Sequence, residues 1–502
     1  MMPPTVEEHE EGSLYDQQPT TKGHTRRSAV MEVAQKNKWY IIGGSAALLI
    51  ILSVVIGVSV STAKNSGSSA SGSSSSPLSA DEQKVADLMG RLESTFDVLG
   101  LPESHSKQLK SSESPQARAL SWVAASEKYD SYSDDQKLQR YALASFFYGT
   151  YAVRNAYVTQ QVPWTTADKW LTDEDECKWE GITCSDNGRV TKMDLEEHRV
   201  SGTIPLDIVL MREHLKEIAL TNNLIFMEGD ALDVFKYLEN IETILLADNY
   251  IVERNGLPKS MRDLTELRKL VLSYNLLQGS IPPNYFTNLN KLTHLEVESN
   301  YLTGALPESI FDMEQLVYLY ARRNDLNFQF QHAIKTANWP NMCTFPCILL
   351  CFAFVFLSMV LIPHDSCSHF ISPPFPHTNN TVSLWLDHNN ITGTFPTEIG
   401  NLAEMASFSL TNTTVSGPIP TEMGLLTGLR RLWLYGNKLE GEIPAELGQL
   451  PILEVVEMYG NNLEGAMPQG VCDAIASADY EYKILSADCA EVTCQDCCTQ
   501  CF

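Results

Sequence analysis

Residues 267–282 read LRKLVLSYNLLQGSIP. Leucines stand at positions 267, 270, 272 and 277, and an asparagine stands at 275, so apolar residues recur at a fixed spacing that ends in Asn. The same pattern occurs nine times between Leu215 and Leu463. Its last position is filled in turn by Asn223, Asn249, Asn275, Asn300, Asn324, Asn389, Thr413, Asn437 and Asn461. These positions are 24 to 26 residues apart, except for 65 residues between the fifth and the sixth.

A period of this size with this apolar pattern is typical of leucine-rich repeats. Each unit forms one short strand, turns, and returns through a looser convex segment, and its leucines become buried only when neighbouring units stack on it. The sequence therefore predicts an α/β solenoid, a leucine-rich repeat horseshoe with a parallel β-sheet on its concave face. We assign residues 190–468 to these repeats.

Composition places the chain among globular proteins and excludes one class of partner. Of its 502 residues, 44% are hydrophobic and 20% are charged, which is ordinary for a folded domain. The 36 basic and 62 acidic residues give a net charge of -26. Because phosphate binding needs basic patches, we expect no nucleic-acid partner.

A long apolar segment precedes the repeats. From Tyr40 to Val60 the sequence reads YIIGGSAALLIILSVVIGVSV, which is long enough to cross a bilayer core of ~30 Å as a helix. Five Lys or Arg residues precede it from position 22 onward, whereas only Lys64 follows within the next twenty residues. This bias predicts a single-pass transmembrane helix at 39–60 in the plasma membrane, a disordered cytoplasmic tail at 1–38 and an extracellular repeat domain. A buried core helix is the alternative.

Two further segments separate this helix from the repeats. Residues 61–79 are rich in Ser and Gly and predict a flexible linker. Residues 80–189 predict a cap with helices near 81–99, 115–125 and 136–151. The first helix has one apolar stripe made of Val85, Leu88, Met89, Leu92, Phe96 and Leu99. Since the end of a solenoid must cover its core, these helices are expected to pack against the first repeat.

Two motifs resemble one known family. Residues 170–190, WLTDEDECKWEGITCSDNGRV, resemble the N-terminal cap of plant-type leucine-rich repeat proteins, in which a Trp precedes Cys-x-Trp-x-Gly-[Ile/Val]-x-Cys. Gly-x-apolar-Pro then occurs seven times and is similar to the LxGxIP signature of the same subclass, starting at Gly202, Gly279, Gly304, Gly393, Gly417, Gly441 and Gly465. The resemblance covers roughly residues 170–468. It implies the extracellular domain of a membrane receptor-like protein or receptor-like kinase that recognises proteins, peptides or glycans.

The chain departs from receptor kinases in several respects. It contains no Gly-rich loop followed by a strand Lys, no His-Arg-Asp and no Asp-Phe-Gly, and the membrane segment comes before the repeats. The 38 residues before the membrane segment are too few for a domain. Signalling would therefore run through a partner such as a co-receptor kinase. A cell-surface adhesion or hydrolase-inhibitor module without signalling is the alternative, and we expect neither enzymatic activity nor a cofactor.

Cysteines gather at the two ends of the repeats. Cys177 and Cys184 flank a turn and are expected to form a disulfide in an oxidising compartment. Residues 469–502 predict a second cap, which contains Cys472, Cys489, Cys494, Cys497, Cys498 and Cys501. The two Cys-x-x-Cys spacings would suit zinc in a cytosolic protein, but outside the cell disulfides are favoured and no metal is expected. Six cysteines allow fifteen pairings, so the connectivity stays open.

One segment interrupts the repeats. Residues 343–381 begin with an uncharged stretch, CTFPCILLCFAFVFLSMVLI. A membrane helix here would place two halves of one solenoid on opposite sides of a bilayer. Joining Met342 directly to Val382 restores a repeat of 26 residues and leaves eight cysteines, so we interpret the segment as a translated intron. A loop on the convex side or a membrane-dipping insert is the alternative.

The candidate ligand-binding residues come from strand positions between the buried ones, which face away from the core because side chains alternate along a strand. Aromatic residues and Arg are the types that dominate binding interfaces. The candidates are Tyr320, Arg322, Trp385, Trp433, Tyr435 and Tyr459. The two tryptophans should stand two strand spacings apart, ~9 to 10 Å. Simple packing across strands is the alternative role. Glycosylation is expected at Asn390 and Asn412, beside this surface.

Overall fold

The structure is a computed structural model. It describes residues 79–151, 153, 161–310, 313, 315–331, 382–478, 483–494 and 497–502. One compact unit, residues 80–153 and 160–502, contains every helix and strand given below, and of the second unit only Ser79 is described. The predicted tail, the transmembrane helix, the rest of the linker and the insert at 343–381 lie outside the described residues.

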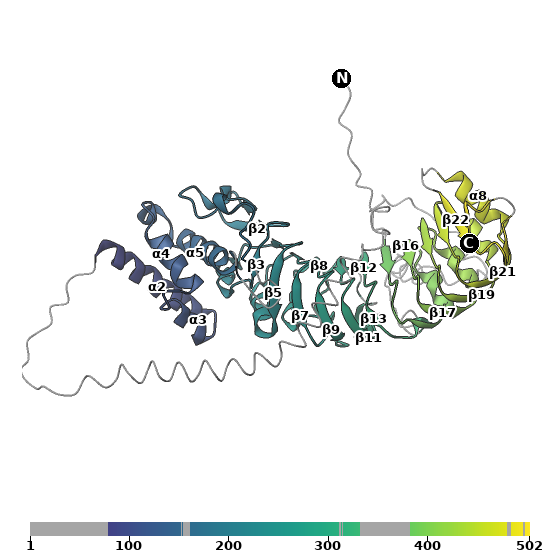
Figure 1. The fold of residues 1–502 in the computed structure, drawn as a ribbon, viewed down its shortest axis with the longest axis horizontal. Helices are drawn as coiled ribbons and strands as arrows, with labels where there is room; N and C mark the ends of the chain where they lie inside the picture. Colours follow the sequence, from purple (N-terminus) through teal and green to yellow (C-terminus); the bar gives the residue numbers. More distant parts are fainter. Residues whose placement is uncertain are drawn as a thin grey trace, which may run out of the picture. The chain divides into compact units, whose positions relative to one another are not determined.

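The main element is a sheet of thirteen strands that follow one another in chain order (Figure 1). Its first two strands are antiparallel and every later neighbour is parallel. The strands are β1 (Ile182–Cys184), β2 (Val190–Asp194), β4 (Glu217–Ala219), β6 (Thr243–Leu245), β8 (Lys269–Val271), β10 (His294–Glu296), β12 (Tyr318–Tyr320), β14 (Val382–Trp385), β16 (Met405–Ser409), β18 (Arg431–Trp433), β20 (Val455–Glu457), β22 (Ile484–Ala487) and β24 (Gln500–Cys501).

Each of the nine repeats adds a second strand after its Asn or Thr position, and one further strand of this kind lies before the first and after the last of them. Six of these strands pair in parallel order, namely β3 (Ser201–Gly202), β5 (Leu224–Glu228), β7 (Tyr250–Glu253), β9 (Leu276–Ser280), β11 (Tyr301–Gly304) and β13 (Asp325–Leu326). Five more follow as β15 (Thr392–Thr394), β17 (Thr414–Gly417), β19 (Lys438–Glu442), β21 (Asn462–Ala466) and β23 (Val492–Thr493). The chain then returns through short 3-10 helices, η4 (Leu206–Met211), η5 (Gly229–Tyr237), η6 (Lys259–Met261), η7 (Glu308–Ile310), η9 (Thr397–Asn401), η10 (Thr421–Leu425) and η11 (Ala445–Gln449).

The repeating asparagines explain why the units stack in one register. The side-chain oxygen of Asn275 accepts a hydrogen bond from the Ile251 N–H at 2.9 Å, and its amide donates to the Leu246 carbonyl at 2.8 Å and to the Leu272 carbonyl at 3.1 Å. One buried amide therefore satisfies backbone groups of two neighbouring repeats where no strand partner is available. The repeat leucines are fully buried around it.

This arrangement continues across the long interruption. The Asn389 oxygen accepts from the Leu326 N–H at 3.1 Å, and its amide donates to the Ala321 carbonyl at 3.1 Å. Strand β12 pairs directly with β14, with Tyr320 opposite Trp385. The repeats on either side of the interruption therefore stack as immediate neighbours. The interpretation of residues 343–381 as a translated intron stays a prediction.

Both ends of the solenoid carry the caps that the sequence predicts. The first cap contains α2 (Ala80–Val98), α3 (Glu103–Gln108), α4 (Pro115–Ala124) and α5 (Asp134–Thr150), and Leu88, Leu92 and Phe96 of the expected stripe are fully buried. The second contains α8 (Gln469–Ser477), β22 and β24. Disulfides join Cys177 to Cys184, Cys472 to Cys497, Cys489 to Cys501, and Cys494 to Cys498. The predicted leucine-rich repeat solenoid with a helical cap and a Cys-rich cap is thus confirmed.

Candidate functional site

The candidate residues lie on the open face of the thirteen-stranded sheet, which we define as the face opposite the leucine core. In β12 the middle residue Leu319 is buried, whereas Tyr318 and Tyr320 on either side are half-buried. Strand β18 repeats this alternation, with Leu432 buried and Trp433 half-buried. The strand period of two therefore places the predicted positions on the open face, as expected.

Five rings on this face form a continuous aromatic run. The run consists of His294, Tyr318, Tyr320, Trp385 and Trp433. The centroids of His294 and Tyr318 are 4.4 Å apart and those of Tyr320 and Trp385 are 4.6 Å apart, both in stacked geometry. Edge contacts of 6.0 and 6.1 Å join Tyr318 to Tyr320 and Trp385 to Trp433. Burial and then the nearby Lys269 lower the pKa of His294, which favours the neutral form of its stacked ring.

The spacing of the two tryptophans differs from the sequence expectation. A separation of ~9 to 10 Å follows from two strand spacings, whereas the ring centroids are 6.1 Å apart. The strand between them carries Ser409 opposite both residues, and this small side chain is buried. Because Ser409 does not fill the space above its strand, the two indoles lean toward each other and make contact.

Arg322 is held within the protein. Its guanidinium forms an ion pair with Glu298, and both side chains are mostly buried, at 13% and 9% exposed. Its central carbon also lies 4.8 Å from the centre of the Trp385 ring. Burial opposes the charged form, but the hydrogen bond to Glu298 and the attraction of nearby negative groups, Glu298 first, together raise the Arg322 pKa. This geometry makes Arg322 a support for Trp385.

Asp387 was not among the candidates, although it occupies the same column as Arg322 one repeat later. Its carboxylate accepts hydrogen bonds from the Ser409 hydroxyl at 2.5 Å and from the Thr411 N–H at 2.7 Å. Burial raises the Asp387 pKa, and these bonds and Arg322 offset that rise only in part. The place of Asp387 in the same column as Arg322 was the sequence feature that could have pointed to it. That this acid becomes buried could not be read from local sequence.

Two other candidates belong to a separate tyrosine stack, which consists of Tyr435, Tyr459 and Phe502. The Tyr435 and Tyr459 rings are stacked at 4.7 Å with only 3° between their planes. Phe502 stacks on Tyr459 at 4.0 Å and is 58% exposed. Phe502 lies in the C-terminal cap and outside the repeat columns, so the strand pattern of the sequence does not point to it. The stack extends the aromatic surface toward that cap.

Polar groups border the aromatic surface. The Trp433 indole N–H donates to Glu457 at 3.1 Å, whereas the buried Trp385 indole N–H has no hydrogen-bond partner among the residues that the structure describes. Asn390 and Asn412 are both exposed. The Asn412 backbone N–H donates to the Tyr435 carbonyl at 3.0 Å, so a glycan there would lie beside the tyrosine stack.

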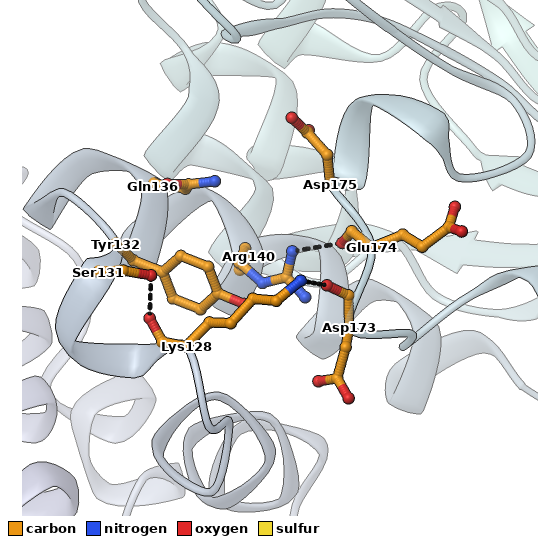
Figure 2. A pocket seen from close by; sticks show the side chains of 8 residues that line it. All are labelled: Lys128, Ser131, Tyr132, Gln136, Arg140, Asp173, Glu174 and Asp175. Carbon is orange, nitrogen blue, oxygen red and sulfur yellow. Dashed lines mark hydrogen bonds between the residues drawn. The ribbon is translucent and has the colours of Figure 1, made fainter.

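A hollow of about 220 Å³ lies in the N-terminal cap and is shown in Figure 2. Its inner wall is Arg140, which is only 1% exposed and is fixed by Glu176 at 2.8 Å and by the Glu174 carbonyl at 3.0 Å. The carboxylates of Asp173, Glu174 and Asp175 point away from this guanidinium (Figure 2). The arrangement is that of a structural ion pair within the cap.

No helix among the described residues is long and apolar enough to cross a membrane. The predicted transmembrane segment at 39–60 is not part of these residues, so this prediction remains a proposal.

Comparisons with known proteins agree with the fold. A leucine rich repeat family matches residues 265–326, and a second leucine rich repeat family matches residues 380–402 and 428–450. The serine/threonine-protein kinase BRI1-like 1 of Arabidopsis thaliana is 26% identical over 168 residues, which are 28% of this chain and 14% of that protein. The receptor-like protein 9DC1 of Solanum pimpinellifolium is 26% identical over 200 residues, which are 34% of this chain and 22% of that protein. These matches therefore span less than a quarter of either relative.

A solved structure gives a similar comparison. The Arabidopsis receptor kinase HAESA, in complex with the peptide hormone IDA and the co-receptor SERK1, aligns with a TM-score of 0.46 and 22% sequence identity over 71% of this chain and 58% of that chain. Together with the thirteen-stranded sheet and the repeating asparagines, the sequence matches identify this chain as a leucine-rich repeat protein similar to plant receptor-like proteins and receptor kinases.

Proposed function

We propose that this protein recognises an extracellular protein, peptide or glycan through the aromatic run and the tyrosine stack on the open face of its sheet. The observation that carries the proposal is the set of contacting, half-buried rings that extends from β10 to β18. Large aromatic side chains that keep part of their surface in solvent are the residues that most often dominate binding energy.

The support beneath the rings strengthens this proposal. Trp385 stacks on Tyr320 and lies over Arg322, which is itself paired with Glu298. Rings that are already fixed lose little conformational entropy on binding, because their rotamers are set before the ligand arrives. The strands beneath them are rigid elements, and rigid elements hold a binding geometry better than loops do. The open face is therefore preorganised.

The protein would act at the plasma membrane, with a transmembrane helix at 39–60, a cytoplasmic N-terminus and the repeats outside. The basic bias on the N-terminal side of that segment supports this orientation. Relatives named as a receptor-like protein and a receptor protein-tyrosine kinase support a role in recognition. Because the sequence carries no kinase motif, signalling would require a partner such as a co-receptor kinase. Because the sequence carries no kinase motif, a second candidate function also stands, namely an adhesion or hydrolase-inhibitor module that binds without signalling.

A topology experiment tests the location. Protease added to intact cells should remove the repeat domain and leave a tag at the N-terminus untouched. Digestion of the tag from outside would reverse the proposed orientation. Capture of a kinase by the full chain, and its loss when residues 1–38 are deleted, would separate the signalling role from the adhesion or inhibitor role.

A binding experiment tests the surface. The full chain displayed on cells would be screened against secreted proteins, peptides and glycans, and each ligand found would be measured against Tyr320→Ala. The matched control is Tyr301→Ala, because Tyr301 is an equally half-buried tyrosine in β11, outside the thirteen-stranded sheet. The proposal requires that only Tyr320→Ala weakens binding. Equal effects of the two variants would exclude the aromatic run as the site.

A further inference from the structure

A groove of about 580 Å³ lies where the N-terminal cap meets the first repeats, and we call it the junction groove. Its walls come from the starts of α3 and α4, the end of α5, and the convex segments η4 and η5. None of its lining residues belongs to the thirteen-stranded sheet, so it is separate from the open face. The apolar lining that reaches solvent consists of Pro102, Pro115, Pro205, Leu206, Ala231 and Tyr237.

Proline rings make the apolar walls of the junction groove rigid. Pro102 precedes α3, Pro115 begins α4 and Pro205 precedes η4. Because a proline ring fixes φ, these wall residues have little freedom to lose when a ligand arrives. A Cβ on Gly149 would lie 3.8 Å from the rings of both Pro115 and Pro205, so cap and repeat meet at this glycine. The groove is therefore preformed, and its volume lies in the range of ~300 to 1,000 Å³ that ligand sites have.

The rim of the junction groove already holds one cation. The Lys236 ammonium lies 2.9 Å from the Asp233 carboxylate and 5.0 Å from the centre of the Tyr237 ring. The hydrogen bond to Asp233 is the largest of the contributions that raise the pKa of Lys236. A second exposed acid, Asp230, lines the same groove and has no ion-pair partner among the residues that the structure describes. Two acids, one base and a tyrosine ring therefore make this rim a site that favours cations.

We propose that the junction groove docks a segment of a partner protein in which an aromatic or aliphatic side chain stands next to an Arg or a Lys. The apolar side chain contacts the proline walls, Leu206 and Ala231. The cation displaces the exposed Lys236 from Asp233 and Tyr237, and Asp230 adds to the attraction. Lys236 shows where this cation lies, because it occupies the same carboxylate and ring within the free protein. This docking surface does not depend on what the open face binds.

The test measures the binding of three short peptides to the full chain by ligand-observed NMR. The peptides are acetyl-Phe-Arg-amide, acetyl-Phe-Glu-amide and acetyl-Ala-Arg-amide. The Phe-Arg peptide should bind most tightly. Loss of the aromatic ring should weaken binding about tenfold or more, since the buried apolar area is lost. The Phe-Glu peptide should also bind more weakly, because its carboxylate meets Asp230 and Asp233.

Three substitutions locate the binding site of the Phe-Arg peptide. Ala231→Trp places an indole in the groove and should abolish binding. Asp230→Asn should weaken binding about threefold, which is the scale of one exposed ion pair. Lys236→Ala removes the competing cation and should strengthen binding. The control is Glu308→Gln, which neutralises an exposed acid of η7 outside the groove and should change nothing.

The direction of the Lys236→Ala effect decides the charge of the occupant. Tighter binding of the Phe-Glu peptide that is lost in Lys236→Ala would show a groove for anions and overturn the proposal. Failure of the Phe-Arg peptide to bind, or binding that is unchanged in all three variants, would overturn it as well. Thermal unfolding shows whether Ala231→Trp is folded. Asp230→Asn and Lys236→Ala change only exposed side chains, so they keep the test valid if the tryptophan variant fails to fold.

Discussion

Two regions of this protein bury acids, and they do so differently. At the junction between the N-terminal cap and the first repeats, Asp207 is fully buried and surrounded by His105, Gln116, Tyr141 and Ser145 at 2.6 to 3.0 Å. In the sheet, Asp387 is buried and accepts hydrogen bonds from Ser409 and Thr411. Burial opposes ionisation at both sites. At Asp207 the interactions with its neighbours, of which His105 is the strongest, together outweigh burial and lower the pKa of the carboxyl group. At Asp387 burial dominates and raises the pKa.

The difference separates a structural junction from the proposed recognition surface. Asp207 links η4 to α3, α4 and α5, and Arg140 pairs with Glu176 in the same cap, so the polar groups there join elements that are distant in sequence. In the sheet, Arg322 lies against the half-buried Trp385 ring, and Asp387 occupies the same column one repeat later. Buried polar networks of this kind hold a fold together, whereas proteins tolerate a less favourable buried charge where a surface serves function, as proposed for the open face.

The largest effect is expected at the cap. Glu176→Ala leaves Arg140 buried without its ion partner and should lower the free energy of unfolding by about 3 to 5 kcal/mol. Urea denaturation of the wild type and of this variant measures the difference in the free energy of unfolding. The control is Glu180→Ala, which breaks an exposed pair with Lys169 and should cost far less stability, because solvent screens an exposed ion pair. Equal costs for the two variants would show that the cap pair does not hold the junction.

Asp207→Asn should lower stability by about 2 to 3 kcal/mol at neutral pH, because a neutral amide replaces a charged acceptor of four donors. The folded pKa of Asp207 lies below its unfolded value, so its contribution is present above the unfolded pKa and is lost as pH falls through the folded pKa. The difference between wild type and variant should therefore shrink in acid. A difference that is constant with pH would contradict the assigned ionisation.

Trp433→Ala should weaken ligand binding by about 2 kcal/mol or more. The melting temperature of the Trp433→Ala variant should fall by less than that of the Trp170→Ala variant. The reason is that Trp170 is 3% exposed within the cap core, whereas Trp433 is half-buried. Affinity and thermal unfolding are measured on both variants. Loss of stability with unchanged affinity would instead assign Trp433 to packing across strands.

Asp387→Asn should have the smallest effect and the opposite sign, a gain of about 1 kcal/mol at neutral pH. The amide oxygen can still accept from Ser409 and Thr411 without a buried charge. Because the folded pKa of Asp387 is raised, its stabilising effect is present below the unfolded pKa and lost as pH rises through the folded pKa. The gain should thus disappear in acid. Stability curves from acid to neutral pH decide this, and a destabilised variant would mean that the carboxylate charge is needed.

The sequence alone determined the solenoid, its register and its two caps. The spacing from Leu267 to Asn275 predicts which side chains are buried, because the strand period of two is a local property. The same period placed Tyr320, Trp385 and Trp433 on the open face. It also predicted the repeat register after the interruption, which the pairing of β12 with β14 matches.

Tertiary structure decided everything that depends on which repeats become neighbours. It selected one pairing of the six C-terminal cysteines. It brought Trp385 and Trp433 into contact above a buried serine and engaged Arg322 with Glu298. It also buried Asp207 among helices that lie 62 to 102 residues away in sequence. The physical reason is that periodicity fixes the direction of a side chain, whereas its contacts depend on the size and charge of residues that only stacking brings beside it.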